Sequence, residues 1–214
     1  MKNSNDYALI YNLVKCYLTL FNCADSQGVI LLVYSCVLTR GISKIQGDMD
    51  MEGGTLLNEH GYASQEIINL MLVGQAKSNV HDGDRDLGDG FVLKGVEKQA
   101  DVGFLTYFES FGYFQVGEHL KNPRLPIWIV CSESHYTVLF SVDSANTKKP
   151  FQKFDLVYYD ELARQEDDII LTVDPGKFKG PSASNNKNPI PIDEVIRTKW
   201  VAGQVCWNGR TIIL

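Results

Sequence analysis

The sequence contains none of the short motifs that mark the common metal, nucleotide and serine-hydrolase sites. It has no HExxH, no CxxC pair, no P-loop, no GxGxxG fingerprint and no GxSxG turn. The glycines of segment 82–90 do not follow a predicted strand, so we interpret them as turn glycines rather than a phosphate-binding loop. These absences argue against the corresponding site classes, and we expect no cofactor.

Basic residues are outnumbered by acidic ones, with 20 Lys and Arg against 26 Asp and Glu, so the formal net charge is −6. Because nucleic-acid phosphates are bound by clustered Lys and Arg, we expect no nucleic-acid partner. The longest apolar run, 28–38, is too short to span a bilayer. Residues 1–6 lack the basic-then-apolar order of a signal peptide, so we expect no membrane partner.

The cysteines are odd in number and show no disulfide or metal-ligand spacing. We therefore interpret them as reduced thiols of a cytoplasmic or nuclear protein, each packed as a small buried hydrophobic residue. They are Cys16, Cys23, Cys36, Cys131 and Cys206.

The order of the predicted elements indicates an α+β fold, with helices first and mainly antiparallel strands later. Apolar residues at helical spacing predict helices in the N-terminal third, and one of these, Val29–Leu38, is apolar almost all round and is predicted to be buried. Strand-forming runs dominate the second half. The predicted helices are 6–23, 29–38 and 65–72, and the main predicted strands are 127–130, 135–142, 154–159, 197–200 and 204–207.

One acidic stretch resembles half of a calcium loop. Asp82, Asp84 and Asp86 supply oxygens at positions one, three and five. Position six is Leu87 instead of glycine, and position twelve is Leu93 instead of a bidentate carboxylate. We favour a solvated turn, with a calcium-binding or purely structural domain as an alternative.

The most informative histidine is His135, in the stretch PIWIVCSESHYTVLF at 126–140. A strand-like run stops at the polar residues 132–134, and His135 opens a second strand. Alternate residues of a strand share a face. The face opposite to that of His135 carries apolar side chains such as Val138 and Phe140, so it is the predicted core face. His135 is therefore expected to point away from the densest packing, at a sheet edge.

Hairpin arithmetic suggests a carboxylate partner for His135. A turn centred near Ala145 would place Asp155 across from His135, where it could fix the imidazole tautomer as the third member of a triad. A slip of one residue in the pairing would turn Asp155 to the opposite face. Asp160 is the second candidate for the carboxylate. The alternative is a partly buried histidine bonded to backbone, without a catalytic role.

Five blocks of the sequence, in order, resemble the MINDY deubiquitinases, and more closely the branch often called the family-with-sequence-similarity type. The resemblance runs from about Gly28 to the C-terminus. The blocks are Leu32–Asp50, His60–Asp82, Ala100–Ser141, Phe154–Gln165 and Arg197–Gly209.

This resemblance implies a papain-like cysteine-protease fold that cuts isopeptide bonds in polyubiquitin, with a preference for proteasome-targeting chains. The expected partners are ubiquitin and polyubiquitin chains. The family's catalytic histidine lies in the block that reads SESHYTVLF here, so His135 is the expected general base.

The family's nucleophilic cysteine lies at a helix N-terminus, and the matching segment would precede residue 1. None of the five cysteines carries the nucleophile motif. We therefore interpret 1–214 as the C-terminal portion of a single MINDY-type catalytic domain, incomplete at its N-terminus. The alternative is an inactive ubiquitin-binding pseudoenzyme or fragment.

Overall fold

A computed structural model of the chain describes residues 4–23, 27–143, 152–163, 165–180 and 189–210. These residues divide into two compact units, Met1–Ile45 and Gln46–Leu214, which are described separately. The prediction that both belong to one catalytic domain stays a prediction.

The first unit is helical. It holds α1 (Ser4–Cys16), α2 (Thr19–Asn22), α3 (Gly28–Arg40) and the start of α4 (Ile42–Asp48). Gly28 begins α3 directly against α2, where a Cβ atom would lie 2.1 Å from the carbonyl oxygen of Leu20.

The prediction that the apolar α3 is buried is wrong for this chain. Val29, Ile30 and Leu31 are each 55% exposed. The physical reason is that a unit of this size offers too little apolar surface to cover a helix that is apolar all round. Within the described ranges no single helix is long and apolar enough to cross a membrane; α3 and α4 together pass by length and composition, across an 85° bend.

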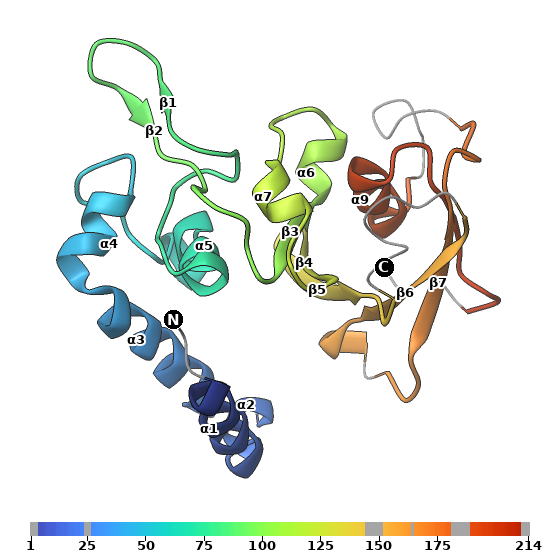
Figure 1. Cartoon of the computed structure of the whole chain (residues 1–214), viewed down its shortest axis with the longest axis horizontal. Helices are drawn as coiled ribbons and strands as arrows, with labels where there is room; N and C mark the ends of the chain where they lie inside the picture. Colours follow the sequence, from blue (N-terminus) through green and yellow to red (C-terminus); the bar gives the residue numbers. More distant parts are fainter. Residues whose placement is uncertain (1–3, 24–26, 144–151, 164, 181–188, 211–214) are drawn as a thin grey trace. The chain divides into compact units, whose positions relative to one another are not determined.

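The second unit begins with small elements and continues into a sheet. Its first part holds η1 (Glu59–Gly61), α5 (Gln65–Val73) and a short hairpin of β1 (Arg85–Asp86) and β2 (Val92–Leu93), which projects from the unit (Figure 1). The segment predicted as a solvated turn forms this hairpin.

A six-stranded sheet organises the rest of the unit, in the order β3-β4-β5-β6-β7-β8. β3 and β4 are parallel, and each following pair is antiparallel. The predicted α+β order, helices followed by a mainly antiparallel sheet, is therefore confirmed. The strand predicted at 197–200 is wrong, because these residues form the end of a helix that begins at Pro191. The elements are β3 (Gly103–Thr106), α6 (Tyr107–Ser110), α7 (Glu118–Lys121), β4 (Ile127–Ser132), β5 (His135–Phe140), β6 (Phe154–Tyr159), η2 (Glu161–Ala163), β7 (Ile169–Asp174), α9 (Pro191–Lys199) and β8 (Gln204–Cys206).

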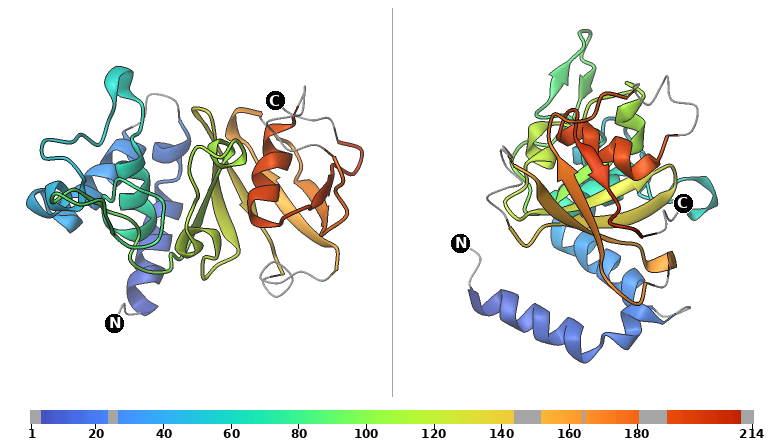
Figure 2. Two further views of the ribbon diagram at one scale, coloured as in Figure 1. Left: turned by 90° about the horizontal axis from the view of Figure 1, so that it is seen from above. Right: turned by 90° about the vertical axis from the view of Figure 1, so that its right-hand side faces the viewer.

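Helix α9 covers one face of this sheet (Figure 2) and supplies the core beneath it. Its residues Ile192, Val195 and Ile196 belong to one buried cluster with strand residues such as Leu139 and Leu171. Pro191 starts the helix. The acidic residues of the first turn and the basic residues of the last turn interact favourably with the helix dipole.

The predicted core face of β5 is wrong. Leu139 is fully buried, whereas Tyr136 is 38% exposed, so the face of β5 that carries His135 is the buried one. The reason is the position of α9, which packs on that face and outweighs the more apolar pattern of the opposite side chains. His135 therefore lies at the end of the core face.

Candidate functional site

His135 is placed by a tight hairpin between β4 and β5. Ser132 and His135 are paired, and the two residues between them form the turn. Glu133 adopts φ 57°, a left-handed conformation that costs a non-glycine residue free energy. The turn thus fixes His135 as the first residue of β5, at the end of an interior strand rather than at the predicted sheet edge.

The imidazole of His135 is held by a buried carboxylate. Its Nε2 lies 2.9 Å from Oδ2 of Asp160. The His135 side chain is 38% exposed and that of Asp160 only 7%. One partner therefore faces solvent, where a substrate can approach, while the other is anchored in the protein.

The Asp160 carboxylate is itself positioned by the start of η2. Its Oδ1 accepts a hydrogen bond of 3.0 Å from the backbone N–H of Leu162, and its own backbone N–H donates to the side chain of Gln165. Gln165 also donates to the carbonyl oxygen of Tyr158. No sequence motif marks Gln165, because its side chain acts only by holding the loop after β6 in place.

The buried hydroxyl group of Tyr158 also lies next to the Asp160 carboxylate. The hydroxyl oxygen lies 3.5 Å from Oδ2 of Asp160. Burial, with the negative charge of Asp160 next to it, raises the pKa of Tyr158 to about 12, so the phenol stays protonated and can donate.

The hydrogen bond determines which nitrogen of His135 is available for chemistry. An ionised carboxylate can only accept, so Nε2 carries the proton in this pair. Nδ1 then presents its lone pair, and it accepts no hydrogen bond from the residues that the structure describes. This is the arrangement of a general base whose orientation is fixed by a carboxylate.

The predicted pairing of His135 with Asp155 is wrong. Asp155 lies opposite Thr172 on β7 and accepts a hydrogen bond of 2.7 Å from its hydroxyl. The β5–β6 register pairs Val138 with Tyr159, so the strands turn later than a centre near Ala145 requires, and the second candidate, Asp160, reaches the imidazole instead. The turn itself lies outside the described residues.

None of the five cysteines can serve His135 as a helix-activated nucleophile in this structure. Cys131 faces Tyr136, and since successive side chains of a strand alternate, it lies on the opposite side of the sheet from His135. Burial raises the pKa of the Cys131 thiol.

The other four cysteines lie elsewhere in the fold. Cys16 is the last residue of α1, Cys23 follows α2, Cys36 lies inside α3, and Cys206 is the last residue of β8. The predicted burial holds only for Cys131, since Cys16, Cys23 and Cys206 are exposed.

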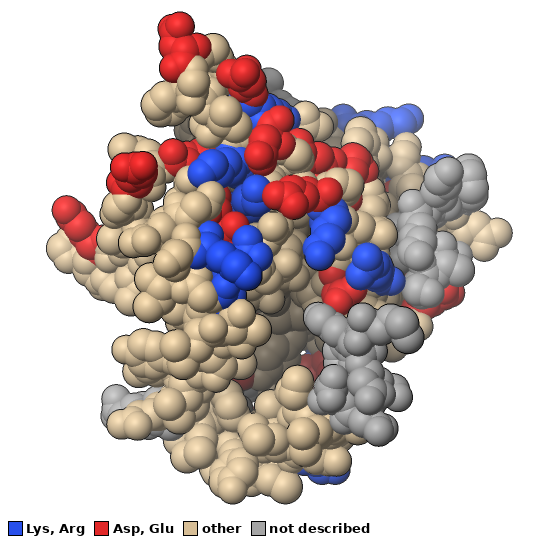
Figure 3. Space-filling model, turned by 60° about the vertical axis from the view of Figure 1, so that its left-hand side comes forward, with Lys and Arg blue, Asp and Glu red and all other residues tan. Residues whose placement is uncertain are grey.

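The acidic residues of the calcium-like segment have other partners. Asp82 accepts hydrogen bonds from the backbone N–H groups of Glu118 and His119 at the start of α7, and Asp84 pairs with Lys77. Among the described residues no group of three or more His, Cys, Asp or Glu side chains is arranged to hold a metal ion. On the face shown in Figure 3, acidic and basic side chains lie intermixed.

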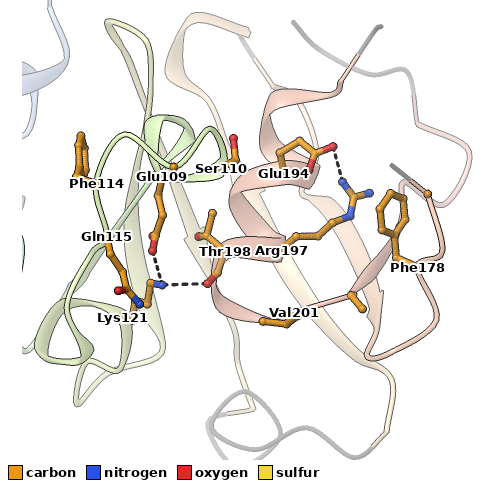
Figure 4. Close-up of a pocket in the computed structure, with 13 residues that line it drawn as sticks. Glu109, Ser110, Phe114, Gln115, Lys121, Phe178, Glu194, Arg197, Thr198 and Val201 are labelled. Atoms are coloured by element: carbon orange, nitrogen blue, oxygen red, sulfur yellow. Dashed lines mark hydrogen bonds and ion pairs between the residues drawn. The ribbon is translucent and has the colours of Figure 1, made fainter. Parts of the chain in front are cut away.

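A pocket of about 700 Å³ lies between α6, α7 and α9 (Figure 4). Lys121 contacts Glu109 at 2.6 Å and the carbonyl oxygen of Thr198 at 3.0 Å. Across the pocket, Arg197 pairs with Glu194 at 3.0 Å. The charges that line the pocket thus largely neutralise one another.

Comparisons with known proteins agree with the resemblance. The family model for the deubiquitinating enzyme MINDY-3/4 conserved domain matches residues 1–209. The chain is 43% identical over 197 residues to the probable ubiquitin carboxyl-terminal hydrolase MINDY-4 of Mus musculus, covering 89% of this chain and 26% of that protein. It is 42% identical over 193 residues to MINDY-4 of Homo sapiens, covering 87% and 25%.

The ubiquitin carboxyl-terminal hydrolase MINDY-3 of Homo sapiens is 44% identical over 138 residues, which cover 60% of this chain and 31% of that protein. The chain therefore spans about a quarter to a third of the length of these relatives. No solved structure matches. The chain belongs to the MINDY-3/4 family of deubiquitinating enzymes.

Proposed function

We propose that this chain supplies the acid–base part of a thiol-dependent ubiquitin isopeptidase site, with His135 as general base and Asp160 as its positioning residue. The observation that carries the proposal is the Nε2–Oδ2 distance of 2.9 Å between a half-exposed imidazole and a buried carboxylate. The names of the relatives, which are ubiquitin carboxyl-terminal hydrolases, support ubiquitin as the substrate.

The proposed reaction uses a papain-like division of labour. Nδ1 of His135 removes the proton of a cysteine thiol, and the thiolate attacks the carbonyl carbon at the carboxyl end of ubiquitin. The C–N isopeptide bond breaks as the imidazolium returns its proton to the leaving lysine amine. Water, deprotonated by His135, then hydrolyses the thioester and releases ubiquitin with a free carboxylate.

Asp160 contributes by stabilising the imidazolium that forms in each half-reaction and by holding the ring. Its burial makes this contribution larger than an exposed carboxylate would give. The proposed nucleophile is a cysteine outside these 214 residues, since the placement of all five present cysteines is unsuitable.

The finer features of the substrate follow the family resemblance. We propose ubiquitin–ubiquitin linkages in proteasome-targeting polyubiquitin chains as the substrate. We propose the cytoplasm or the nucleus as the place of action, which agrees with free thiols in all five cysteines.

A second candidate is a ubiquitin-binding module without catalysis. The observation in its favour is that no described helix begins at any of the five cysteines, so the chain by itself presents no activated thiol. A protein that includes the upstream segment and that binds ubiquitin chains without cleaving them would favour this candidate.

The test is reaction of a protein that includes the upstream segment with a ubiquitin probe carrying a cysteine-reactive group at its carboxyl end. We expect His135→Ala to slow labelling by about a hundredfold or more, because thiolate formation loses its base. His119→Ala, which changes a histidine of α7, serves as the matched control and should label normally. Equal labelling of the wild type and His135→Ala would overturn the role of His135.

A further inference from the structure

Four aromatic side chains cluster on the surface in and after α6. Phe108, Phe111, Tyr113 and Phe114 are 37%, 39%, 74% and 43% exposed. Neighbouring ring centroids lie 6.0–6.5 Å apart, namely Phe111–Tyr113, Phe108–Tyr113 and Phe108–Phe114. We name these four residues the aromatic patch.

The aromatic patch is anchored from within the fold. The ring of buried Tyr107 packs edge-on against Phe111, with centroids 4.8 Å apart, and Tyr107 belongs to the core beneath α9. Thr106 caps α6 through its hydroxyl oxygen, which accepts from the N–H of Phe108. Exposed, pre-positioned aromatic rings are typical of protein-binding surfaces, because they bury a large area at little entropic cost.

The aromatic patch follows β3 at the end of the sheet where β5 begins with His135. Thr106 is paired with Cys131 in the parallel β3–β4 ladder, so Tyr107 follows next to Ser132, the partner of His135. The pKa of Tyr107 is raised by burial and further by the negative charges of Glu194 and Glu133, and Glu133 lies in the turn before His135. A protein that rests on the aromatic patch is thereby brought to the end of the sheet where His135 lies.

The pocket of Figure 4 continues the aromatic patch. Phe114 and Gln115 line one side of it, and Phe178 lies on the other side with its ring 3.6 Å from the guanidinium of Arg197. Because Lys121 pairs with Glu109 and Arg197 pairs with Glu194, the pocket carries little net charge beside its apolar surface. We therefore expect association through buried apolar area rather than through net charge.

We propose that the aromatic patch and the adjoining pocket hold the ubiquitin whose carboxyl end is presented to His135. This inference rests on the proposed function and adds to it the surface that binds the substrate. Its occupant is ubiquitin, because relatives of the chain are named ubiquitin carboxyl-terminal hydrolases and the aromatic patch lies at the end of the sheet where His135 begins β5.

The test measures binding of fluorescently labelled ubiquitin to the 214-residue chain by anisotropy. We expect Tyr113→Ser combined with Phe114→Ser to weaken binding by about tenfold or more, since truncated aromatic residues at an interface lose hot-spot contacts. Phe91→Ser is the matched control, because Phe91 is 59% exposed on the β1–β2 segment and outside the aromatic patch. Affinity should change less than about threefold across a tenfold range of salt.

Kinetics of the longer protein provide the second readout. The double variant should raise KM about tenfold and leave kcat within about twofold, because it removes binding and spares His135. If the double variant binds and cleaves ubiquitin as the wild type does, the aromatic patch is not the ubiquitin-binding surface, whereas the proposed function is unaffected. A double variant that loses self-association but still binds ubiquitin would also overturn the proposed binding surface. A wild-type protein that neither binds nor cleaves ubiquitin would overturn both the binding surface and the proposed function.

Discussion

Nε2 of His135 and Oδ2 of Asp160 lie 2.9 Å apart, although the two residues are separated by 25 positions in the sequence. The contact exists because β5 and β6 are adjacent and antiparallel, and because Asp160 follows β6 at the end of the sheet where β5 begins. A partly exposed imidazole thereby gains a buried carboxylate as its hydrogen-bond partner.

The first prediction concerns the protonation of His135. In its neutral form the ring should carry its proton on Nε2, because the Asp160 carboxylate accepts from that nitrogen. NMR of the imidazole nitrogens in the 214-residue chain measures the tautomer. A neutral ring protonated mainly on Nδ1 would contradict the assignment of Nδ1 as the basic nitrogen.

The second prediction concerns cysteine reactivity. Cys131 is buried and its thiol pKa is raised, so iodoacetamide should modify it much more slowly than the exposed Cys206. Mass spectrometry after a short reaction with the native chain measures both rates, and urea-unfolded protein provides the control in which they converge. Preferential labelling of native Cys131 would instead identify it as an activated thiol.

The third prediction tests which face of β5 is the core. Leu139 is fully buried under α9, so Leu139→Ala should lower the free energy of unfolding by about 3 kcal/mol. Val142→Ala, at a position 92% exposed, should change it by less than about 0.5 kcal/mol. Urea unfolding compares the two variants, and similar losses in both would show that the buried face has been assigned incorrectly.

Part of this arrangement was predictable from the sequence. The strand that begins at His135 follows from alternation and from the polar turn before it, and the α+β order follows from periodicity. The partner of His135 did not follow, because the register of β6 depends on the length and path of a connection that no local pattern specifies. The buried face of β5 depends on α9, more than 50 positions later in the chain.

The fourth prediction concerns pH and stability. Burial raises the pKa of Asp193 to about 6 from 3.8, so its contribution to stability is present below pH 3.8 and is lost as pH rises through about 6. Relative to Asp193→Asn, the wild type should therefore lose about 2 kcal/mol of unfolding free energy between about pH 4 and pH 7. The asparagine retains an acceptor for Nε1 of Trp207, which donates to Oδ1 of Asp193 at 3.0 Å.

Urea unfolding of both proteins at the two pH values measures this difference. Parallel pH dependences for the wild type and Asp193→Asn would contradict the assigned pKa.

The most direct test of the central claim compares Asp160→Asn with Asp155→Asn in a protein that includes the upstream segment. Both variants remove one carboxylate charge near the same strand, but only Asp160 contacts the imidazole. The measurement is kcat for cleavage of a ubiquitin–ubiquitin isopeptide bond. We predict a loss of about a hundredfold or more for Asp160→Asn and an unchanged kcat for Asp155→Asn. Equal kcat values for the two variants would contradict the account.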